Sequence, residues 1–300
     1  GGVGGLEIGD DVLLINMQGD ATNHGNVGNY EIKEVARINY GQNTVFFTTN
    51  LQKIYGATDS NATLTGQKIM LQRVPRYRSL RIEGTLTADA WNGEKGGVMF
   101  VKVLQSTEVI GSIDMNTKGY RGSADSNRGN GESYTGRGSS GDIGSNNAGG
   151  GAGRYRHCGS GGGYASGGSA YNNVYYSGSC SPGATYGAPE LTKWFLGSGG
   201  GSVRDRNYYW TGQDAGGIVI LWTSGLSVRG SIQSRSGTTS RYLAGSGGTI
   251  FLRARSMNVG NNKVNAASHS RGGAGRIRLD FFGLSGTTNP SFYPGFAGDT

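Results

Sequence analysis

The fold is decided by residues 96–103, GGVMFVKV, where a double glycine introduces a short apolar run. The same phrase returns at 216–222 as GGIVILW and at 247–254 as GGTIFLRA. Each copy is followed by a second apolar run, within 109–115, 226–232 and 257–266. One pair of short strands cannot bury its apolar face alone, so repeated pairs must stack on one another. The repeat therefore predicts a stacked all-β body.

We expect an all-β chain in four parts. Residues 1–75 contain short apolar runs separated by polar turns, which predicts a small N-terminal β-barrel or sandwich. Residues 76–118 and 216–282 form the repeat body, interpreted either as a β-solenoid-like stack or as the successive hairpins of a sandwich. A glycine- and tyrosine-rich insertion at 119–215 interrupts this body, and 283–300 form a C-terminal tail.

Glycine makes up 58 of the 300 residues, against roughly 7% in an average protein. Glycine loses more backbone entropy on folding than any other residue, so close packing within or between chains has to offset that loss. The glycine runs in 119–215 have two interpretations. They form extended, polyproline-II-like strands that pack side by side, or they form surface loops. The composition is compatible with both.

The chain carries a net charge of +8, with 28 basic and 20 acidic residues. This excess is typical of a solubilising surface, or of attraction to anionic polysaccharide, lipid or nucleic acid. The Arg-Gly steps are similar to those of RNA-binding tails, but such tails are disordered and lack flanking strands, so no nucleic acid partner is expected. No apolar run reaches the ~20 residues that a membrane span requires, so no span is expected.

The two cysteines, Cys158 and Cys180, both lie in the glycine-rich insertion. An even count in a loop-like region predicts a disulfide and an oxidising compartment, with the protein extracellular or at the cell surface. Two unpaired thiols are the alternative. The bridge would close a loop of about 22 residues, which the chain-entropy model values at roughly 3 kcal/mol.

The search for catalytic groups is negative. The three histidines, His24, His157 and His269, have no carboxylate or cysteine at metal-ligand spacing. The glycine-rich runs lack the Lys-Ser/Thr ending of a phosphate-binding loop. We therefore expect a protein that is not an enzyme and that has no catalytic residues, no cofactor and no metal site.

Aromatic residues gather in the insertion, where tyrosine with glycine and serine is typical of rigid contact surfaces. Such a surface suits subunit contacts or sugar stacking, and tyrosine packing over glycine within one chain is the alternative. The candidate contact residues are Tyr164, Tyr171, Tyr175, Tyr176, Tyr208, Tyr209 and Trp210. In the tail, Phe292, Tyr293 and Phe296 are candidates for docking on a second subunit, with capping of the repeat body as the alternative.

The repeat, a double glycine with alternating apolar residues followed by a glycine-rich tract, resembles long secreted glycine-rich surface proteins of bacteria. Residues 9–19, GDDVLLINMQG, and 74–77, VPRY, look like the opening of the same group. This resemblance implies an extracellular, β-rich surface role. The insertion also resembles, more loosely, phage tail-tip adhesins that stack polyglycine strands.

These observations predict an extracellular structural protein, a self-assembling subunit of a filament, sheath or surface layer. The expected partner is another copy of the chain, in a homo-oligomer or homopolymer. The alternative is a cell-surface or phage-type adhesin that binds polysaccharide.

Overall fold

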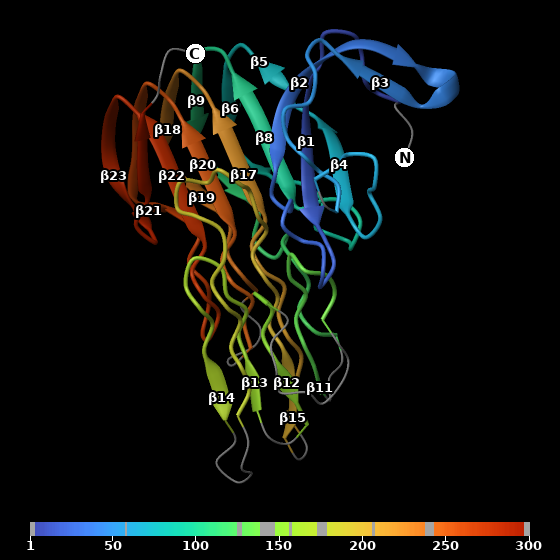
Figure 1. The fold of residues 1–300 in the computed structure, drawn as a ribbon. Helices are drawn as coiled ribbons and strands as arrows, with labels where there is room; N and C mark the ends of the chain where they lie inside the picture. Colours follow the sequence, from blue (N-terminus) through green and yellow to red (C-terminus); the bar gives the residue numbers. More distant parts are fainter. Residues whose placement is uncertain are drawn as a thin grey trace.

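The computed structural model describes residues 4–57, 59–124, 128–138, 148–155, 158–172, 179–205, 208–237 and 243–296. Strands, turns and extended segments make up this part of the chain, in which the one helical element is a 3-10 turn, η1 (Tyr40–Gln42). The molecule is elongated (Figure 1). Parallel sheets form one end, a small N-terminal sheet lies beside them, and glycine-rich segments extend to the opposite, distal end.

The N-terminal sheet is a single open layer and not the barrel or sandwich predicted for residues 1–75. Its antiparallel order is β3-β2-β1-β4. Strand β1 has both faces buried, and the face that carries Leu13 and Ile15 packs with Phe100 and Ile220 of the repeat body. The sheet thus needs no second layer of its own. The strands are β1 (Asp11–Gln18), β2 (Tyr30–Asn39), β3 (Thr44–Phe47) and β4 (Lys68–Arg73).

Two larger sheets contain the repeat, and all neighbouring strands in them are parallel. The six-stranded sheet, in the order β24-β22-β20-β17-β8-β5, comprises β5 (Arg76–Tyr77), β8 (Val98–Val103), β17 (Ile218–Trp222), β20 (Thr249–Arg253), β22 (Arg276–Phe281) and β24 (Tyr293–Phe296).

The eight-stranded sheet has the order β6-β9-β18-β21-β19-β10-β7, and β23 pairs with β21. Strand β21 is long enough to pair with β18 through its first half and with β19 through its second. The strands are β6 (Leu80–Ile82), β7 (Thr85–Leu86), β9 (Ser106–Val109), β10 (Ser112–Asp114), β18 (Gly225–Val228), β19 (Ser231–Gln233), β21 (Ser256–Asn265) and β23 (Gly283–Asn289).

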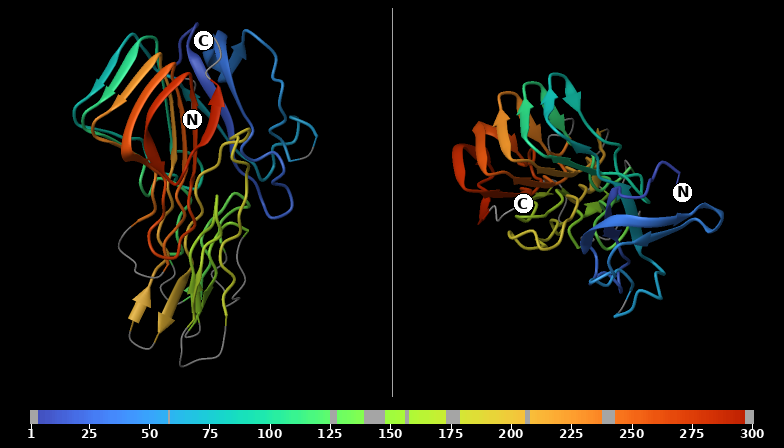
Figure 2. Two further views of the ribbon diagram at one scale, coloured as in Figure 1. Left: turned by 90° about the vertical axis from the view of Figure 1, so that its left-hand side faces the viewer. Right: turned by 90° about the horizontal axis from the view of Figure 1, so that it is seen from above.

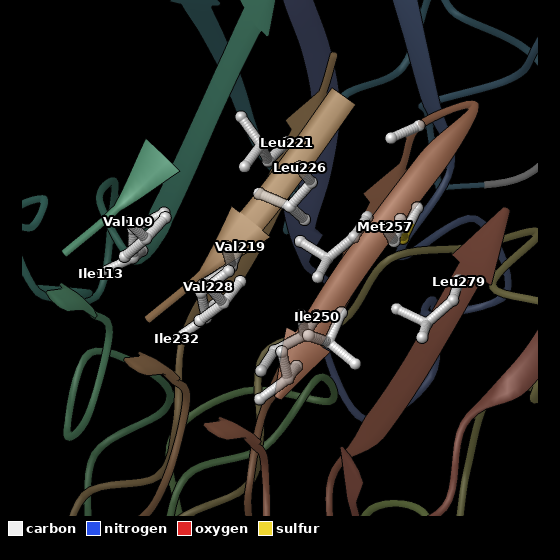
Figure 3. Close-up of a cluster of buried hydrophobic side chains, with 14 of the residues drawn as sticks. Val109, Ile113, Val219, Leu221, Leu226, Val228, Ile232, Ile250, Met257 and Leu279 are labelled. Carbon is white, nitrogen blue, oxygen red and sulfur yellow. The ribbon is translucent and has the colours of Figure 1, made fainter. Parts of the chain in front are cut away.

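The predicted solenoid or sandwich is therefore wrong, although the prediction of strands was sound. The two parallel sheets face each other across one core in a nearly closed barrel (Figures 2 and 3). Successive hairpins are excluded because parallel neighbours need long crossovers. A simple run of coils also fails, since residues 115–217 separate the first copy from the second along the chain. Alternation of apolar residues reveals a strand's faces but not its partner.

The six-stranded sheet is buried on both faces, as is usual for parallel sheets. Val219 and Leu221 point into the barrel core, whereas Ile218 and Ile220 belong to a second cluster on the outer face. Trp194 completes that outer cluster and stacks on Tyr30 of the N-terminal sheet, with ring centroids 3.5 Å apart. The outer cluster thus fixes the N-terminal sheet to the barrel.

The glycine-rich segments form a bundle whose hydrogen bonds repeat every three residues. The N–H of Gly197 donates to the carbonyl of Gly216 at 3.0 Å. Three residues on, the N–H of Gly200 donates to the carbonyl of Gln213, also at 3.0 Å. The carbonyl of Gly197 accepts a hydrogen bond from the N–H of Tyr120, and the carbonyl of Gly200 accepts one from the N–H of Ser123. A period of three is that of a polyproline-II helix, whereas a β-strand repeats every two.

Segment 197–201 lies at the centre of this bundle. A β-strand hydrogen-bonds to two neighbours in its sheet, but this segment contacts more because its polar groups point in three directions. The first interpretation of the glycine runs, packed extended strands, therefore holds for the central part of the insertion. The surrounding segments are 120–123, 131–132, 151–152, 160–162, 213–216 and 243–247.

Close approach of backbones explains why glycine is needed here. A Cβ atom on Gly199 would lie 2.0 Å from the carbonyl oxygen of Arg121. One on Gly200 would lie 2.0 Å from that of Leu243. Both contacts are with main-chain atoms, which cannot rotate away, so a side chain forces the segments apart.

We predict that Gly199→Ala destabilises the protein by at least about 3 kcal/mol, because overpacking against fixed backbone is costly. Gly84→Ala is the matched control, since a Cβ there meets nothing within 4 Å. The control should change the free energy of unfolding by less than about 1 kcal/mol. Chemical denaturation measures both. Equal effects of the two substitutions would contradict the close-packed bundle.

Candidate functional site

The outer strands of the two parallel sheets are the first candidate site. On one side the sheets end in β5, β6 and β7, and on the other in β23 and β24. Large apolar side chains are exposed on these end strands. Tyr77 of β5 is 46% exposed and Phe296 of β24 is 69% exposed. Unpaired edges with apolar side chains are surfaces on which another strand can add.

The two exposed aromatics occupy the same row of the six-stranded sheet. Tyr77 is the register partner of Val103, and Phe281 is the partner of Phe296. The preceding row runs from Arg76 through the adjacent strands to Gly295, so both ends share one register. If β5 of a second copy were added at β24 as a parallel strand in the same register, Tyr77 of that copy would lie beside Phe296 of the first copy.

The eight-stranded sheet shows the same correspondence. Leu80 of β6 and Leu284 of β23 lie at opposite ends of the row that passes through Thr107, Leu226 and Met257. Both end residues are partly buried and pack against the barrel core. The core is therefore only partly covered at its two ends.

The tail residues form part of these edges. Phe292 packs on Phe281 of β22, with ring centroids 6.0 Å apart, and both pack against the barrel core. Phe296 packs edge-on against Phe282 at 4.6 Å, and both remain largely exposed. Tyr293 is 36% exposed on the same strand, β24. The tail therefore caps the core with one aromatic and presents two to the outside.

Tyr164 was predicted to belong to a contact surface of the insertion. This prediction is wrong, because its side chain is fully buried. Its hydroxyl hydrogen-bonds with that of Thr249 at 2.8 Å, and its ring packs against Tyr186 and Phe195. Burial raises the pKa of Tyr164 to about 12. This tyrosine fills space between the bundle and the barrel, which was the alternative role for the aromatics.

Other predicted aromatics lie at the distal end, on short strands of the bundle (Figure 1). Tyr171 of β14 (Ala170–Asn172) meets Trp210 of β16 (Tyr208–Trp210) edge-on, with centroids 5.6 Å apart. The guanidinium of Arg271 lies 5.6 Å from the Tyr171 ring. Tyr208 and Tyr209 also belong to β16, but only their backbone is described. Tyr175 and Tyr176 lie outside the described residues.

The expected disulfide is present. Cys158 of β13 (Cys158–Ser160) is bonded to Cys180, with their Cα atoms 5.6 Å apart. Both cysteines are buried beside Ala152. The bridge ties two segments of the bundle together.

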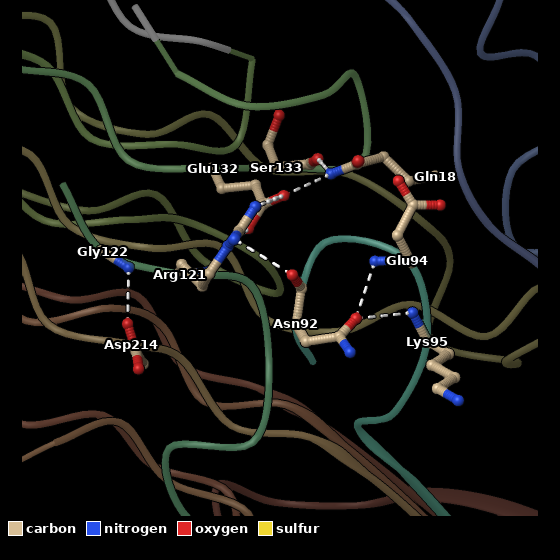
Figure 4. A network of polar contacts seen from close by, with 9 residues as sticks. All are labelled: Gln18, Asn92, Glu94, Lys95, Arg121, Gly122, Glu132, Ser133 and Asp214. Carbon is tan, nitrogen blue, oxygen red and sulfur yellow. Dashed lines mark hydrogen bonds and ion pairs between the residues drawn. The ribbon is translucent and has the colours of Figure 1, made fainter. Parts of the chain in front are cut away.

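A buried carboxylate joins the N-terminal sheet to the bundle, and the sequence analysis did not single it out (Figure 4). Glu132 is 2% exposed and pairs with the Arg121 guanidinium at 2.8 Å. The amide of Gln18, at the end of β1, donates to the same carboxylate at 3.0 Å. Burial raises the pKa of Glu132, but the hydrogen bonds from Arg121 and Gln18 outweigh it and hold the pKa below its usual value.

Asp214 lies on the other side of Arg121 and accepts a hydrogen bond from the N–H of Gly122 at 2.8 Å. Burial raises the pKa of Asp214, and the negative charge of Glu132 adds to the effect. The pKa values of the two carboxylates are therefore shifted in opposite directions, but each carboxylate holds backbone or side chains of the bundle. Their contacts make them structural groups.

The chain matches no family model, no curated protein and no solved structure. Within the described residues no group of three or more His, Cys, Asp and Glu side chains is arranged to hold a metal ion. Nor does that part of the chain contain a helix long and apolar enough to cross a membrane.

The lowered pKa of Glu132 predicts acid sensitivity. A carboxylate whose pKa is lower in the folded state stabilises the protein above its unfolded pKa, and this contribution is lost as the pH falls through the folded value. Glu132→Gln should cost about 2 kcal/mol at pH 7. It should also flatten the fall in Tm between about pH 5 and 3.

Thermal unfolding followed across pH measures this effect. Glu94→Gln is the matched control, because Glu94 is 69% exposed in its pair with Lys68. The control should leave both the Tm at pH 7 and the shape of the acid profile nearly unchanged. A profile for Glu132→Gln that overlays that of the unsubstituted protein would refute the assignment.

Proposed function

We propose that the chain is an extracellular structural protein whose copies assemble head to tail into a filament, sheath or surface layer. The observation that carries this proposal is the correspondence between the two open sides of the parallel sheets. Phe296 and Tyr77 lie at opposite ends of one row, and Leu284 and Leu80 at opposite ends of another.

A second copy would pair with the open edge strands of both parallel sheets at once. Strand β24 of one copy would pair with β5 of the next, and β23 with β6, all in the parallel sense already present. The contact would bury the exposed rings of Phe296 and Tyr77 and close the open ends of the core. Because this interface joins two different surfaces, each added copy presents a free edge to the next one, and a linear assembly grows wherever the rotation between copies does not close a ring.

The disulfide between Cys158 and Cys180 supports the extracellular part of the proposal, since such bonds persist in oxidising compartments. The glycine bundle gives no separate reason for assembly. Its backbone hydrogen bonds are made within one chain, so the ordering of the glycines does not itself require a second subunit. Self-association therefore depends on the sheet edges.

Sedimentation velocity over a concentration series tests the proposal. The unsubstituted chain should form larger species as its concentration rises, whereas Phe296→Asp should remain monomeric because a buried carboxylate has no partner at the contact. Tyr40→Asp is the matched control, since Tyr40 is an aromatic that is 63% exposed in the 3-10 turn η1, between strands β2 and β3 of the N-terminal sheet. It should assemble like the unsubstituted chain.

The alternative function is that of an adhesin, and the grouping of Tyr171, Trp210 and Arg271 at the distal end favours it. Aromatic rings with nearby cations are suited to sugar rings and acidic groups. An unsubstituted chain that stays monomeric at all concentrations would contradict assembly. Retention of a polysaccharide by that monomer, lost in Trp210→Ala, would establish the adhesin instead.

A further inference from the structure

A pocket of about 370 Å³ lies where the last strands of the six-stranded sheet meet the glycine-rich insertion. Its walls come from parts of the chain that are distant in sequence. Residues 274–277 surround the start of β22, residues 290–294 surround the start of β24, and 165–166 and Pro189 belong to the insertion. A cavity of about 150 Å³ is enough to hold benzene. This pocket therefore has room for a ring and a short chain attached to it.

Arg276 is the only charged residue among the described residues that line the pocket. Its Nη2 donates hydrogen bonds to the carbonyls of Tyr186, at 2.7 Å, and Gly187, at 3.0 Å. Its guanidinium carbon lies 5.2 Å from the centroid of the Tyr164 ring. These contacts hold the guanidinium in place before a ligand arrives, so little side-chain entropy is lost when the ligand binds.

The partners of Arg276 are neutral groups, and no carboxylate pairs with it in the part of the chain that the structure describes. Its Nε is buried and has no hydrogen-bond acceptor among those residues. Arg278, two residues further along β22, is different because it pairs with Asp280 at 2.7 Å. Charged groups that leave water are usually paired with an opposite charge. An anion is therefore the partner that Arg276 lacks.

The remaining lining combines hydroxyl groups with an apolar surface. The Ser166 hydroxyl accepts a hydrogen bond from the N–H of Ala274 at 2.9 Å, which leaves its own proton to donate to a ligand. Ser291 also lines the pocket and is exposed. Mostly apolar lining with a few polar groups is typical of sites for small organic molecules. The apolar wall consists of Pro189, Ile277, Pro290, Phe292, Tyr293 and Pro294.

We propose that this edge pocket binds a small carboxylic acid whose body is an aromatic ring or a short hydrocarbon chain. One guanidinium matches the single charge and the two oxygens of a carboxylate, whereas a phosphate carries more charge than one cation offsets. The Ser166 hydroxyl donates to the same carboxylate, and the body of the ligand packs against Ile277, Phe292 and the prolines. The site requires only one chain, so it does not rest on the proposed assembly.

Calorimetric titration of the full chain with 4-phenylbutyrate tests the proposal. The uncharged ligand for comparison is 4-phenylbutanol, and acetate is the anion without an apolar body. The titrations use the Phe296→Asp chain, because a second copy added at β24 would lie beside Tyr293, whereas Phe296 is not part of the lining. We expect 4-phenylbutyrate to bind at least about tenfold more tightly than either compound, since the alcohol lacks the charge-assisted hydrogen bonds and acetate buries little apolar surface.

Two substitutions separate the charge from the cavity. Arg276→Gln should weaken the binding of 4-phenylbutyrate by about tenfold or more and leave that of 4-phenylbutanol nearly unchanged, which a merely structural role would not do. Ser291→Trp should fill the pocket and weaken the binding of both. The matched controls are Arg229→Gln, because Arg229 is 72% exposed outside the lining, and Ser256→Trp, because Ser256 is an exposed serine of β21.

Thermal unfolding of each variant checks that it is folded. If Arg276→Gln does not fold, the comparison of the three ligands and the effect of Ser291→Trp decide the matter. The proposal is overturned if the alcohol or acetate binds as tightly as 4-phenylbutyrate, because the first removes the role of the charge and the second that of the apolar wall. It is also overturned if either folded variant binds like its control. Tight binding of the acid alone, weakened by the substitutions in the pocket, supports it.

Discussion

The hydrogen bonding of bare backbone to bare backbone in the glycine bundle is the constraint on which the rest of the structure depends. Segments with side chains cannot approach to the distances seen at Gly199 and Gly200. The loss of backbone entropy is large for glycine, so the bundle is ordered only because its N–H and carbonyl groups are paired within it. Burial of apolar side chains stabilises mainly the other end of the molecule, the barrel.

The double glycines join these two kinds of packing. Gly216 accepts a hydrogen bond from Gly197 and so belongs to the bundle. Gly217, the next residue, accepts from the N–H of Thr249 and begins the ladder of the parallel sheet. The chain thus passes from a period of three to a period of two across one dipeptide. Strands that leave the bundle side by side enter the barrel parallel and in register.

The sequence predicts the strands and their faces because alternation is a local property. The runs at 96–103, 216–222 and 247–254 contain β8, β17 and β20, and the disulfide joins the two cysteines as expected. The pairing of strands is not local, so the barrel and the open N-terminal sheet could not be read from these runs. Tyr164 was misplaced for the same reason, since its burial depends on Phe195 and Thr249, which are distant in sequence.

The candidate sites show the same division. Phe296 was singled out as an aromatic of a polar tail, but Tyr77, at the other end of its row, became visible only with the register. Lys102 and Arg253 belong to no motif along the chain, and only parallel pairing places them on either side of Trp222. Residues brought together by register leave no motif at any fixed spacing.

The central claim is that residues 197–201 are held by backbone hydrogen bonds to their neighbours throughout the bundle. Amide hydrogen exchange of Gly197, Gly199, Gly200 and Gly201, followed by NMR, tests it most directly. The account predicts protection comparable to that of the β17 amides, because both are released only when the molecule unfolds. Exchange of these four amides at the rate of an open loop, with β17 still protected, would contradict it.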